Sequence, residues 1–148
     1  MRVKLELGAL FAIFLLSATT AWADRAVVLV VSTDSPIETL SALDVRKAYL
    51  GIAVRHGGQE IRALRLSNDP ELDEIFLQSV VAMSEKSYTY RLLSNALRYG
   101  RPRPPEVRDL EALLNALSTN PYSIACVWQS DADRFPELEI LRVLWQDY

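Results

Sequence analysis

The feature that most constrains the fold is an unbroken apolar run that leads into a well-specified helix. Residues 26–32 read A-V-V-L-V-V-S, and such a run is typical of a strand covered on both faces. The helix expected next is capped by Ser41, with Asp44 completing a capping box, and it ends before Gly51. A buried strand followed by a loop and a capped helix indicates an α/β domain.

Strands and helices are expected to alternate along the rest of the chain. The expected strands are residues 61–66, 123–128 and 139–145, and the expected helices are residues 70–83, 85–99 and 110–117. Leu72, Phe76 and Val80 fall on one stripe, which is predicted to face inward. Residues 101–105 contain three prolines and exclude a regular helix, and residues 129–136 have a turn-like composition. The order predicts one α/β domain, with a mixed sheet of four or five strands and helices on both faces.

Residues 1–23 have the features of a secretory signal peptide. A basic start precedes an apolar run at residues 7–16, and residues 21–23 read A-W-A, a small-x-small cleavage site. The run is shorter than the roughly 20 residues that a membrane span needs. We therefore expect a mature domain of residues 24–148 that is periplasmic or secreted and does not insert into the membrane. A retained N-terminal anchor is the alternative.

The charge of this expected domain limits the class of partner. Without the signal peptide, the 16 basic and 19 acidic residues of the full sequence become 14 and 18, a net charge of −4. This mild acidity argues against nucleic acid or an anionic membrane surface as the partner. The single cysteine, Cys126, excludes an internal disulfide, and its apolar neighbours indicate a thiol packed in a buried strand.

No residue pattern supports an enzyme, a metal site or a cofactor. His56 is the only histidine and lies beside two glycines in a predicted turn, without the partners of a catalytic triad or a zinc site. The sequence also lacks a glycine-rich phosphate loop and a nucleophile elbow. We therefore expect a non-enzymatic protein that needs no metal or cofactor.

Three segments together resemble the phosphate-type periplasmic solute-binding proteins. Residues 35–51, S-P-I-E-T-L-S-A-L-D-V-R-K-A-Y-L-G, are similar to a helix-opening element of that family. Residues 100–107, G-R-P-R-P-P-E-V, look like the glycine and paired prolines of its small secreted relatives. Residues 120–128, N-P-Y-S-I-A-C-V-W, are similar to the entry into one of its strands.

The resemblance implies a fold, a ligand class and a partner. The implied fold is a single lobe of the type II periplasmic-binding-protein-like fold, in the phosphate ABC transporter substrate-binding class. The implied ligand is a small oxyanion, and the implied partner is a membrane transporter. Full-length members close two lobes around the ligand. This chain has the length of one lobe, so a closed site would need a second molecule.

The segment that holds the anion in that family is altered in this sequence. The family places a Ser-Gly-Thr type of loop at a helix N-terminus, where free N–H groups and the helix dipole bind the anion. The matching residues 65–71 read R-L-S-N-D-P-E, and Pro70 removes one donor. Four carboxylates surround this helix start, those of Asp69, Glu71, Asp73 and Glu74. Because these like charges would repel an anion, we expect a self-capped structural helix, with the anion site as the alternative.

A hydroxyl-rich loop leaves the first strand and is one candidate ligand site. Ser32, Thr33 and Ser35 are its candidate ligand-binding residues, because α/β folds usually bind ligands at the carboxyl ends of strands. The alternative is that these hydroxyl groups only cap the turn.

An arginine-rich loop is the second candidate, as a surface for an anion or a partner. Its arginines are Arg98, Arg101, Arg103 and Arg108. Guanidinium groups bind carboxylate and phosphate well, and a proline-rich loop lowers the cost of ordering on docking. The alternative is a solvated basic loop, in which removing Arg101 and Arg103 would hardly change stability.

Two leading functions remain open at this point, beside a weaker third option, a metal-free enzyme, which a catalytic pair in a cleft would be needed to support. The first is an exported solute-binding-protein-like domain that binds a small oxyanion. The second is an accessory module that has lost solute binding and binds a membrane sensor or transporter. Retained anion contacts would favour the first function, and the acidic helix start favours the second.

Overall fold

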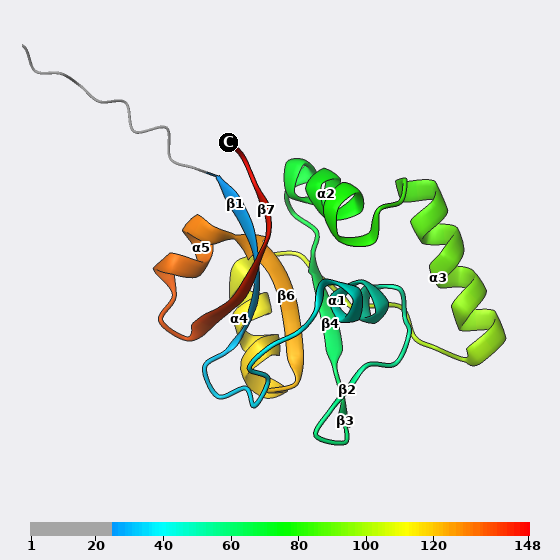
Figure 1. Cartoon of the computed structure of the whole chain (residues 1–148), viewed down its shortest axis with the longest axis horizontal. Helices are drawn as coiled ribbons and strands as arrows, with labels where there is room; N and C mark the ends of the chain where they lie inside the picture. Colours follow the sequence, from blue (N-terminus) through cyan, green and yellow to red (C-terminus); the bar gives the residue numbers. More distant parts are fainter. Residues whose placement is uncertain (1–24) are drawn as a thin grey trace, which may run out of the picture.

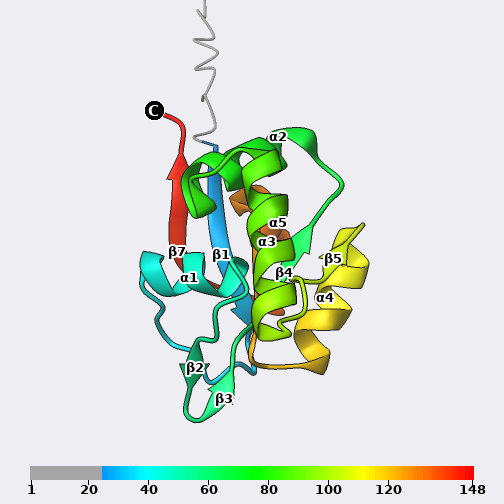
Figure 2. The ribbon, with the colours of Figure 1, turned by 90° about the vertical axis from the view of Figure 1, so that its right-hand side faces the viewer.

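The computed structural model describes residues 25–148, so the predicted signal peptide lies outside the described residues. These residues form one five-stranded sheet with helices on both faces (Figures 1 and 2). The strands occur in the spatial order β5 (Glu106–Val107), β4 (Arg62–Leu66), β6 (Ser123–Trp128), β1 (Ala26–Ser32) and β7 (Leu138–Gln146). The predicted α/β class with a mixed sheet is therefore confirmed.

The direction of the strands decides which loops lie at which edge of the sheet. β4 is parallel to both β5 and β6, whereas β1 is antiparallel to β6 and to β7. The carboxyl ends of β4 and β6 therefore lie at one edge, and the carboxyl end of β1 lies at the opposite edge. β1 is the most deeply buried strand, as its apolar run predicted, and residues 27–31 are fully buried.

Two helical layers cover the sheet (Figure 1). One layer contains α1 (Ala42–Tyr49), α2 (Pro70–Ile75), the π-helix η1 (Phe76–Val81) and α3 (Glu85–Tyr99). The other contains α4 (Leu110–Thr119) and α5 (Gln129–Arg134). A short hairpin of β2 (Arg55–His56) and β3 (Gln59–Glu60) turns at Gly57 and Gly58, which both have positive φ angles. Among residues 25–148, no helix has the length and apolar character needed to cross a bilayer.

The expected helices form, with two differences. The helix expected at residues 70–83 changes to π geometry at Phe76, and this register keeps Phe76 and Val80 buried with Leu72, as the predicted stripe requires. The prediction of a turn after β6 was wrong, because α5 forms there. Asp131 in its first turn and Arg134 in its last turn form an i,i+3 ion pair that also suits the helix dipole.

Candidate functional site

The start of α2, at the carboxyl end of β4, is closed by its own side chains. The carboxylate of Asp69 accepts hydrogen bonds from the backbone N–H groups of Glu71 (2.9 Å) and Leu72 (3.3 Å). Its second oxygen accepts a hydrogen bond from Trp128 Nε1 at 2.8 Å. These bonds, above all the one from Trp128, lower the pKa of Asp69 below its ordinary value. The predicted self-capped helix is confirmed.

An ion pair closes the same helix start from outside. Arg25 donates two parallel hydrogen bonds of 2.8 Å to the carboxylate of Glu71, and its guanidinium lies 4.5 Å from the ring centre of Trp128. The hydrogen bond to Arg25 lowers the pKa of Glu71. The backbone N–H groups of Glu71 and Leu72 and the carboxylates of Asp69 and Glu71 are thus paired within this cluster, so these backbone donors are not free for an anion.

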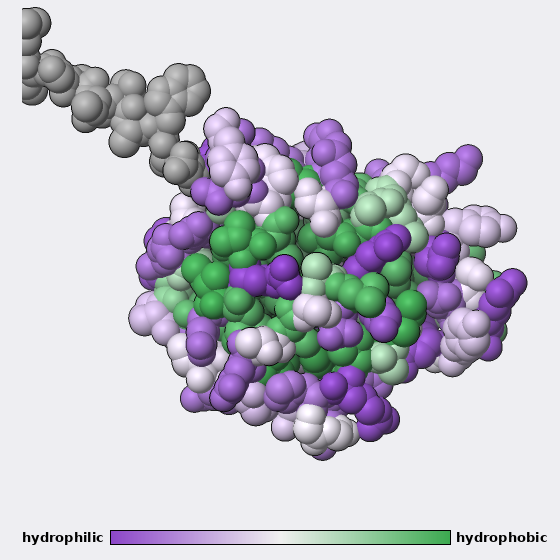
Figure 3. All heavy atoms as spheres, viewed as in Figure 1, coloured by the Kyte–Doolittle hydropathy of each residue, from purple (hydrophilic) through white to green (hydrophobic). Residues whose placement is uncertain are grey.

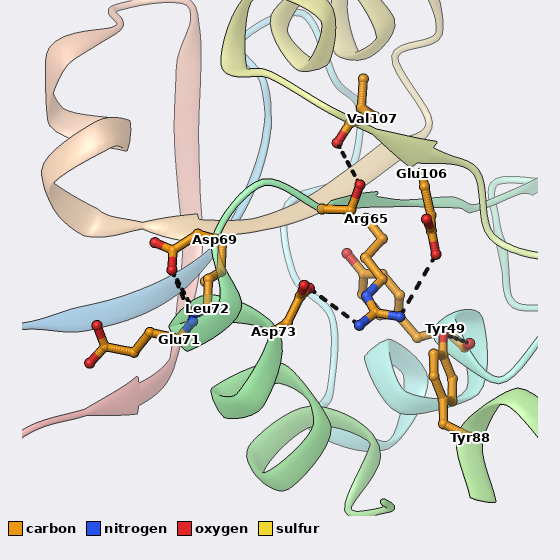
Figure 4. Close-up of polar contacts among 10 residues, drawn as sticks. Tyr49, Arg65, Asp69, Glu71, Leu72, Asp73, Tyr88, Glu106 and Val107 are labelled. Carbon is orange, nitrogen blue, oxygen red and sulfur yellow. Dashed lines mark hydrogen bonds and ion pairs between the residues drawn. The ribbon is translucent and has the colours of Figure 1, made fainter. Parts of the chain in front are cut away.

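Arg65, near the end of β4, is held differently (Figure 4). Its Nη2 donates to Asp73 Oδ1 at 3.2 Å, while Nη1 lies 3.9 Å from a carboxylate oxygen of Glu106, too far for a hydrogen bond. Nε of Arg65 is buried and has no hydrogen-bond acceptor among residues 25–148. The side chain of Arg65 is 15% exposed and that of Glu106 is 61% exposed. Arg65 therefore has one hydrogen-bonded partner, Asp73, one more distant ionic partner, Glu106, and one N–H donor without an acceptor among the described residues.

Two aromatic rings contact the Arg65 guanidinium, and a third ring packs against one of them. The guanidinium lies 4.8 Å from the ring centre of Phe76 and 5.5 Å from that of Tyr88. Phe76 packs edge-on against both Tyr49 and Tyr88. Tyr88 donates its hydroxyl hydrogen to the backbone oxygen of Tyr49 at 2.7 Å, and Tyr49 donates to that of Leu64 at 2.8 Å. Both tyrosines are buried, which raises the pKa of each above the ordinary value, so they remain neutral donors.

A pocket of about 270 Å³ opens beside Arg65. Its lining brings together β4, α3 and the proline loop, with Arg65, Glu85, Tyr88, Thr89, Leu92, Arg103, Pro104 and Glu106. Two arginines and two glutamates therefore face one another across a space large enough for a small ion. Asp73, the hydrogen-bonded partner of Arg65, has a raised pKa because its carboxylate is partly desolvated, although Arg65 opposes that shift.

The hydroxyl loop after β1 lies at the other edge of the sheet from this pocket, because β1 and β4 run in opposite directions. The Ser32 side chain is buried, and its hydroxyl accepts a hydrogen bond from the Asp34 N–H at 3.3 Å. The Ser35 hydroxyl accepts one from the Ile37 N–H at 3.2 Å, and Thr33 is exposed. Two of the three hydroxyl groups thus cap the turn, which is the structural alternative for this loop.

The four candidate arginines do not form one surface. Arg103 is exposed and lines the Arg65 pocket, while Arg98 is on the outer side of α3 and Arg108 is exposed before α4. Arg101 donates from Nε to the backbone oxygen of Gly51 at 2.8 Å and forms an ion pair with Glu60. The alternative of a solvated loop is therefore wrong for Arg101, which ties the proline loop to the end of α1.

Arg65 is the residue that sequence reasoning left without a role. The available signal was an arginine inside the otherwise apolar end of a short strand, A-L-R-L at residues 63–66, where a charge needs partners. The thiol of Cys126 is buried behind the aromatic cluster, where it donates to the Tyr49 hydroxyl at 3.4 Å, and burial raises its pKa to about 12. This agrees with the expected inert, packed thiol. Within residues 25–148, no group of three or more His, Cys, Asp or Glu side chains is placed to hold a metal ion.

Comparison with known proteins identifies solved structures that share the fold of this chain. No protein-family model and no curated protein matches the sequence. This chain is similar to an ABC-type phosphate transport receptor from Vibrio cholerae, known from a crystal structure. The similarity covers 80% of this chain and 46% of the receptor chain, with a TM-score of 0.57 and 11% identity. PstS from Borrelia burgdorferi also matches 80% of this chain and 47% of its own, with a TM-score of 0.57 and 15% identity.

The fold is that of one lobe of a periplasmic binding protein. The likeness extends over most of the described residues, whereas the chain spans about half the length of each receptor. At such low identity the comparison supports the architecture alone, because related folds carry different sites. What this lobe binds must be argued from its own side chains.

Proposed function

We propose that the protein is an exported, non-enzymatic solute-binding-protein-like domain that holds a small oxyanion weakly at Arg65. The observation that carries the proposal is the buried Nε of Arg65, which has no acceptor among residues 25–148 and belongs to a side chain that lines the polar pocket. A buried donor without an acceptor costs about 1–3 kcal/mol. An oxyanion in the pocket that accepted this hydrogen bond, after the Arg65 side chain turned Nε toward the pocket, would recover that cost.

Glu106 resembles the ligand that this site would take. A carboxylate and an oxyanion both present acceptor oxygens to a guanidinium fork. The Glu106 side chain is exposed and its contact with Arg65 is loose, so an oxyanion could displace it at little cost. Arg103 is on the same pocket wall and adds a second positive charge. The proline loop, which was a candidate surface from the sequence, would thus contribute Arg103 to the site.

The charges around the pocket predict weak binding. Glu85 and Glu106 line it, and Asp73 already takes one edge of Arg65. The nearby helix start offers no donors, because Asp69 accepts its free N–H groups. One charge-assisted contact against this background suggests a dissociation constant on the order of 1 mM, equivalent to about −4 kcal/mol.

Export is part of the proposal and rests on the sequence. Residues 1–23 have the signal-peptide pattern, and residues 24–148 would be the mature domain. One of the two similar structures is described as a phosphate transport receptor, which makes phosphate, and sulfate as a similar oxyanion, the first anions to test. A transporter in the membrane is the partner class that this comparison suggests for the proposed domain.

The test compares thermal unfolding of the wild type and of Glu106→Gln with added phosphate or sulfate. An anion at ten times its dissociation constant should stabilise the folded state by about 1.4 kcal/mol. Glu106→Gln removes the competing charge, so it should tighten binding by several-fold, up to about tenfold. Arg103→Ala should weaken binding while leaving stability within about 0.5 kcal/mol.

Glu111→Gln is the matched control, because it makes the same change on an exposed face of α4. The proposal would be wrong if Glu106→Gln and Glu111→Gln changed the response to anions equally. It would also be wrong if neither anion stabilised Glu106→Gln at concentrations well above 10 mM, where a site of about 1 mM is nearly saturated.

A second function is favoured by a different observation. The closed start of α2 removes the donors that an ordinary anion site would use, which fits an accessory module that binds a membrane sensor or transporter instead. Under this alternative, the anion experiments would give a flat response in every variant.

A further inference from the structure

α3 has a second apolar face that the fold does not use. Its inner face packs into the core through Tyr88 and Leu92, which are buried. On the opposite side of the helix, Tyr90, Leu93 and Leu97 are 73%, 50% and 79% exposed, and we refer to them as the outer stripe. Figure 2 shows α3 in front of the sheet, on the outside of its layer. Large apolar side chains gathered on one solvent-facing stripe are typical of an interaction surface.

The spacing of this stripe fits another helix. Counted from Lys86, the outer stripe follows at intervals of four, three and four residues, which is the spacing of the seam between packed helices. The neighbours of the seam are small, namely Ser87, Thr89, Ser94 and Ala96. Small flanking residues let a second helix approach closely, so that its side chains fit between those of the outer stripe.

The charge beside the stripe selects the kind of helix. Lys86, Arg91 and Arg98 line a surface hollow that follows one side of the outer stripe, together with Tyr90 and Tyr99. The one acidic residue of α3, Glu85, lines the Arg65 pocket instead. The chain as a whole has a net charge of −3, so this basic face contrasts with the rest of the protein.

We propose that the outer face of α3 binds an acidic amphipathic helix of a partner protein. The partner helix would place apolar side chains on Tyr90, Leu93 and Leu97, and carboxylates beside Arg91 and Arg98. Opposite charges fix the orientation and speed the encounter, while the acidic remainder of the molecule repels the same helix elsewhere. A second copy of this chain fits less well, because pairing two α3 helices would oppose two basic faces.

A second hydrophobic area is visible over β7 and α1, where Leu43, Ile140 and Val143 are exposed (Figure 3). β7 is an edge strand, but its pairing with β1 is interrupted by two register shifts. Such irregularities twist an edge away from further strands. In addition, Arg142 donates to the backbone oxygen of Leu40 at 2.9 Å and lies across this area. Charge and spacing therefore single out α3.

The test uses a fluorescently labelled helical peptide of about three heptads, with leucine at the seam positions and glutamate beside them. A control peptide has lysine at every glutamate position. Fluorescence anisotropy with the full chain should show the glutamate peptide binding at least tenfold more tightly than the lysine peptide. Added salt should reduce this difference.

Two variants of α3 and two matched controls locate the binding site. Leu93→Ser with Leu97→Ser should weaken binding of the glutamate peptide at least tenfold, and so should Arg91→Glu with Arg98→Glu. The controls are Leu43→Ser and Arg108→Glu, which alter other exposed positions and should leave binding unchanged. All four changes are at the surface, so circular dichroism should show the fold intact.

Several results would overturn the proposal. Equal binding of the two peptides would remove the charge argument, and equal losses in Leu43→Ser would remove the site. A wild-type dimer that Leu93→Ser with Leu97→Ser dissociates would identify a second copy as the occupant. The outcome is separable from the anion proposal, because Tyr90, Leu93 and Leu97 do not line the Arg65 pocket.

Discussion

Two clusters of arginine and carboxylate side chains lie beside the same short helix, α2. They differ in how completely their hydrogen-bonding groups are paired. At the start of α2, Arg25 donates two hydrogen bonds to Glu71, and Trp128 donates one to Asp69. On the side of α2, Arg65 has one firm bond to Asp73, one loose contact and a buried Nε without an acceptor among residues 25–148. The difference shows that net charge does not identify a binding site. In our proposal, the binding site is the cluster around Arg65, where a donor has no acceptor among residues 25–148 and the side chain lines a pocket.

The pKa values of two carboxylates, that of the N-cap Asp69 and that of Asp73 in α2, differ in the same way. The hydrogen bonds that Asp69 accepts stabilise its anionic form, so its pKa is lowered. Asp73 is four residues further along, where desolvation outweighs the attraction of Arg65 and raises its pKa. Hydrogen bonds therefore outweigh desolvation at Asp69, whereas at Asp73 the attraction of Arg65 only partly offsets desolvation.

The largest expected effect comes from removing the aromatic ring of Phe76, which supports the Arg65 guanidinium. Phe76 is buried under the Arg65 guanidinium and touches Tyr49 and Tyr88. Phe76→Ala should reduce the free energy of unfolding by about 3–5 kcal/mol, because it loses transfer energy and leaves a cavity. Urea unfolding measures this cost. Phe135→Ala, at a half-buried position near the end of α5, should cost clearly less.

A loss below about 1 kcal/mol for Phe76→Ala would contradict the account of how Arg65 is positioned. The aromatic residues around position 76 would then rearrange easily, and they would not hold the guanidinium in a fixed position in the pocket. A large loss in Phe135→Ala alone would contradict the burial of the two sites.

The smaller expected effect separates the two clusters by pH. The lowered pKa of Asp69 gives stability that is present above its ordinary pKa and is lost as pH falls through the lowered value. The raised pKa of Asp73 acts in reverse, because its contribution is present at low pH and is lost as pH rises through the raised value. Both side chains are only partly buried and remain in contact with solvent, so each effect should stay below about 1 kcal/mol.

Asp69→Asn and Asp73→Asn test these opposite signs while keeping the side-chain size. Between about pH 3 and pH 6, Asp69→Asn should lose stability relative to wild type mainly as pH rises up to about 4, near the ordinary pKa of Asp, and Asp73→Asn should gain stability mainly as pH rises above that value. Urea unfolding across that range gives both differences. Two slopes of the same sign would show that the clusters are not held in opposite ways.

Local signals in the sequence predicted a large part of the fold. Ser41 and Asp69 cap their helices through the expected side-chain bonds, and Gly100 ends α3 in the left-handed conformation. These features depend on neighbouring residues, so a short window of sequence contains the information. The buried β1 was predictable for the same reason, since its run of valines excludes a solvent-facing side.

The candidate site was not predictable in the same way, because it depends on strand direction and on distant contacts. The hydroxyl loop at Ser32 is separated from the Arg65 pocket because β1 runs antiparallel to β6. Arg101 acquires its structural role from Gly51, 50 residues earlier in the chain. Arg65 meets Glu106 only because the short β5 pairs with β4. No periodicity within the sequence encodes these pairings.

The central claim is that a small anion is bound by the spare donor of Arg65. The most direct measurement is an NMR titration of the arginine Nε–H resonances with sulfate, using Arg101 as an internal reference whose Nε already donates to Gly51. The account predicts that the Arg65 resonance moves most and saturates at millimolar sulfate, that Arg103 moves less, and that Arg101 stays in place. A stationary Arg65 resonance, with shifts confined to exposed arginines such as Arg108, would contradict the account.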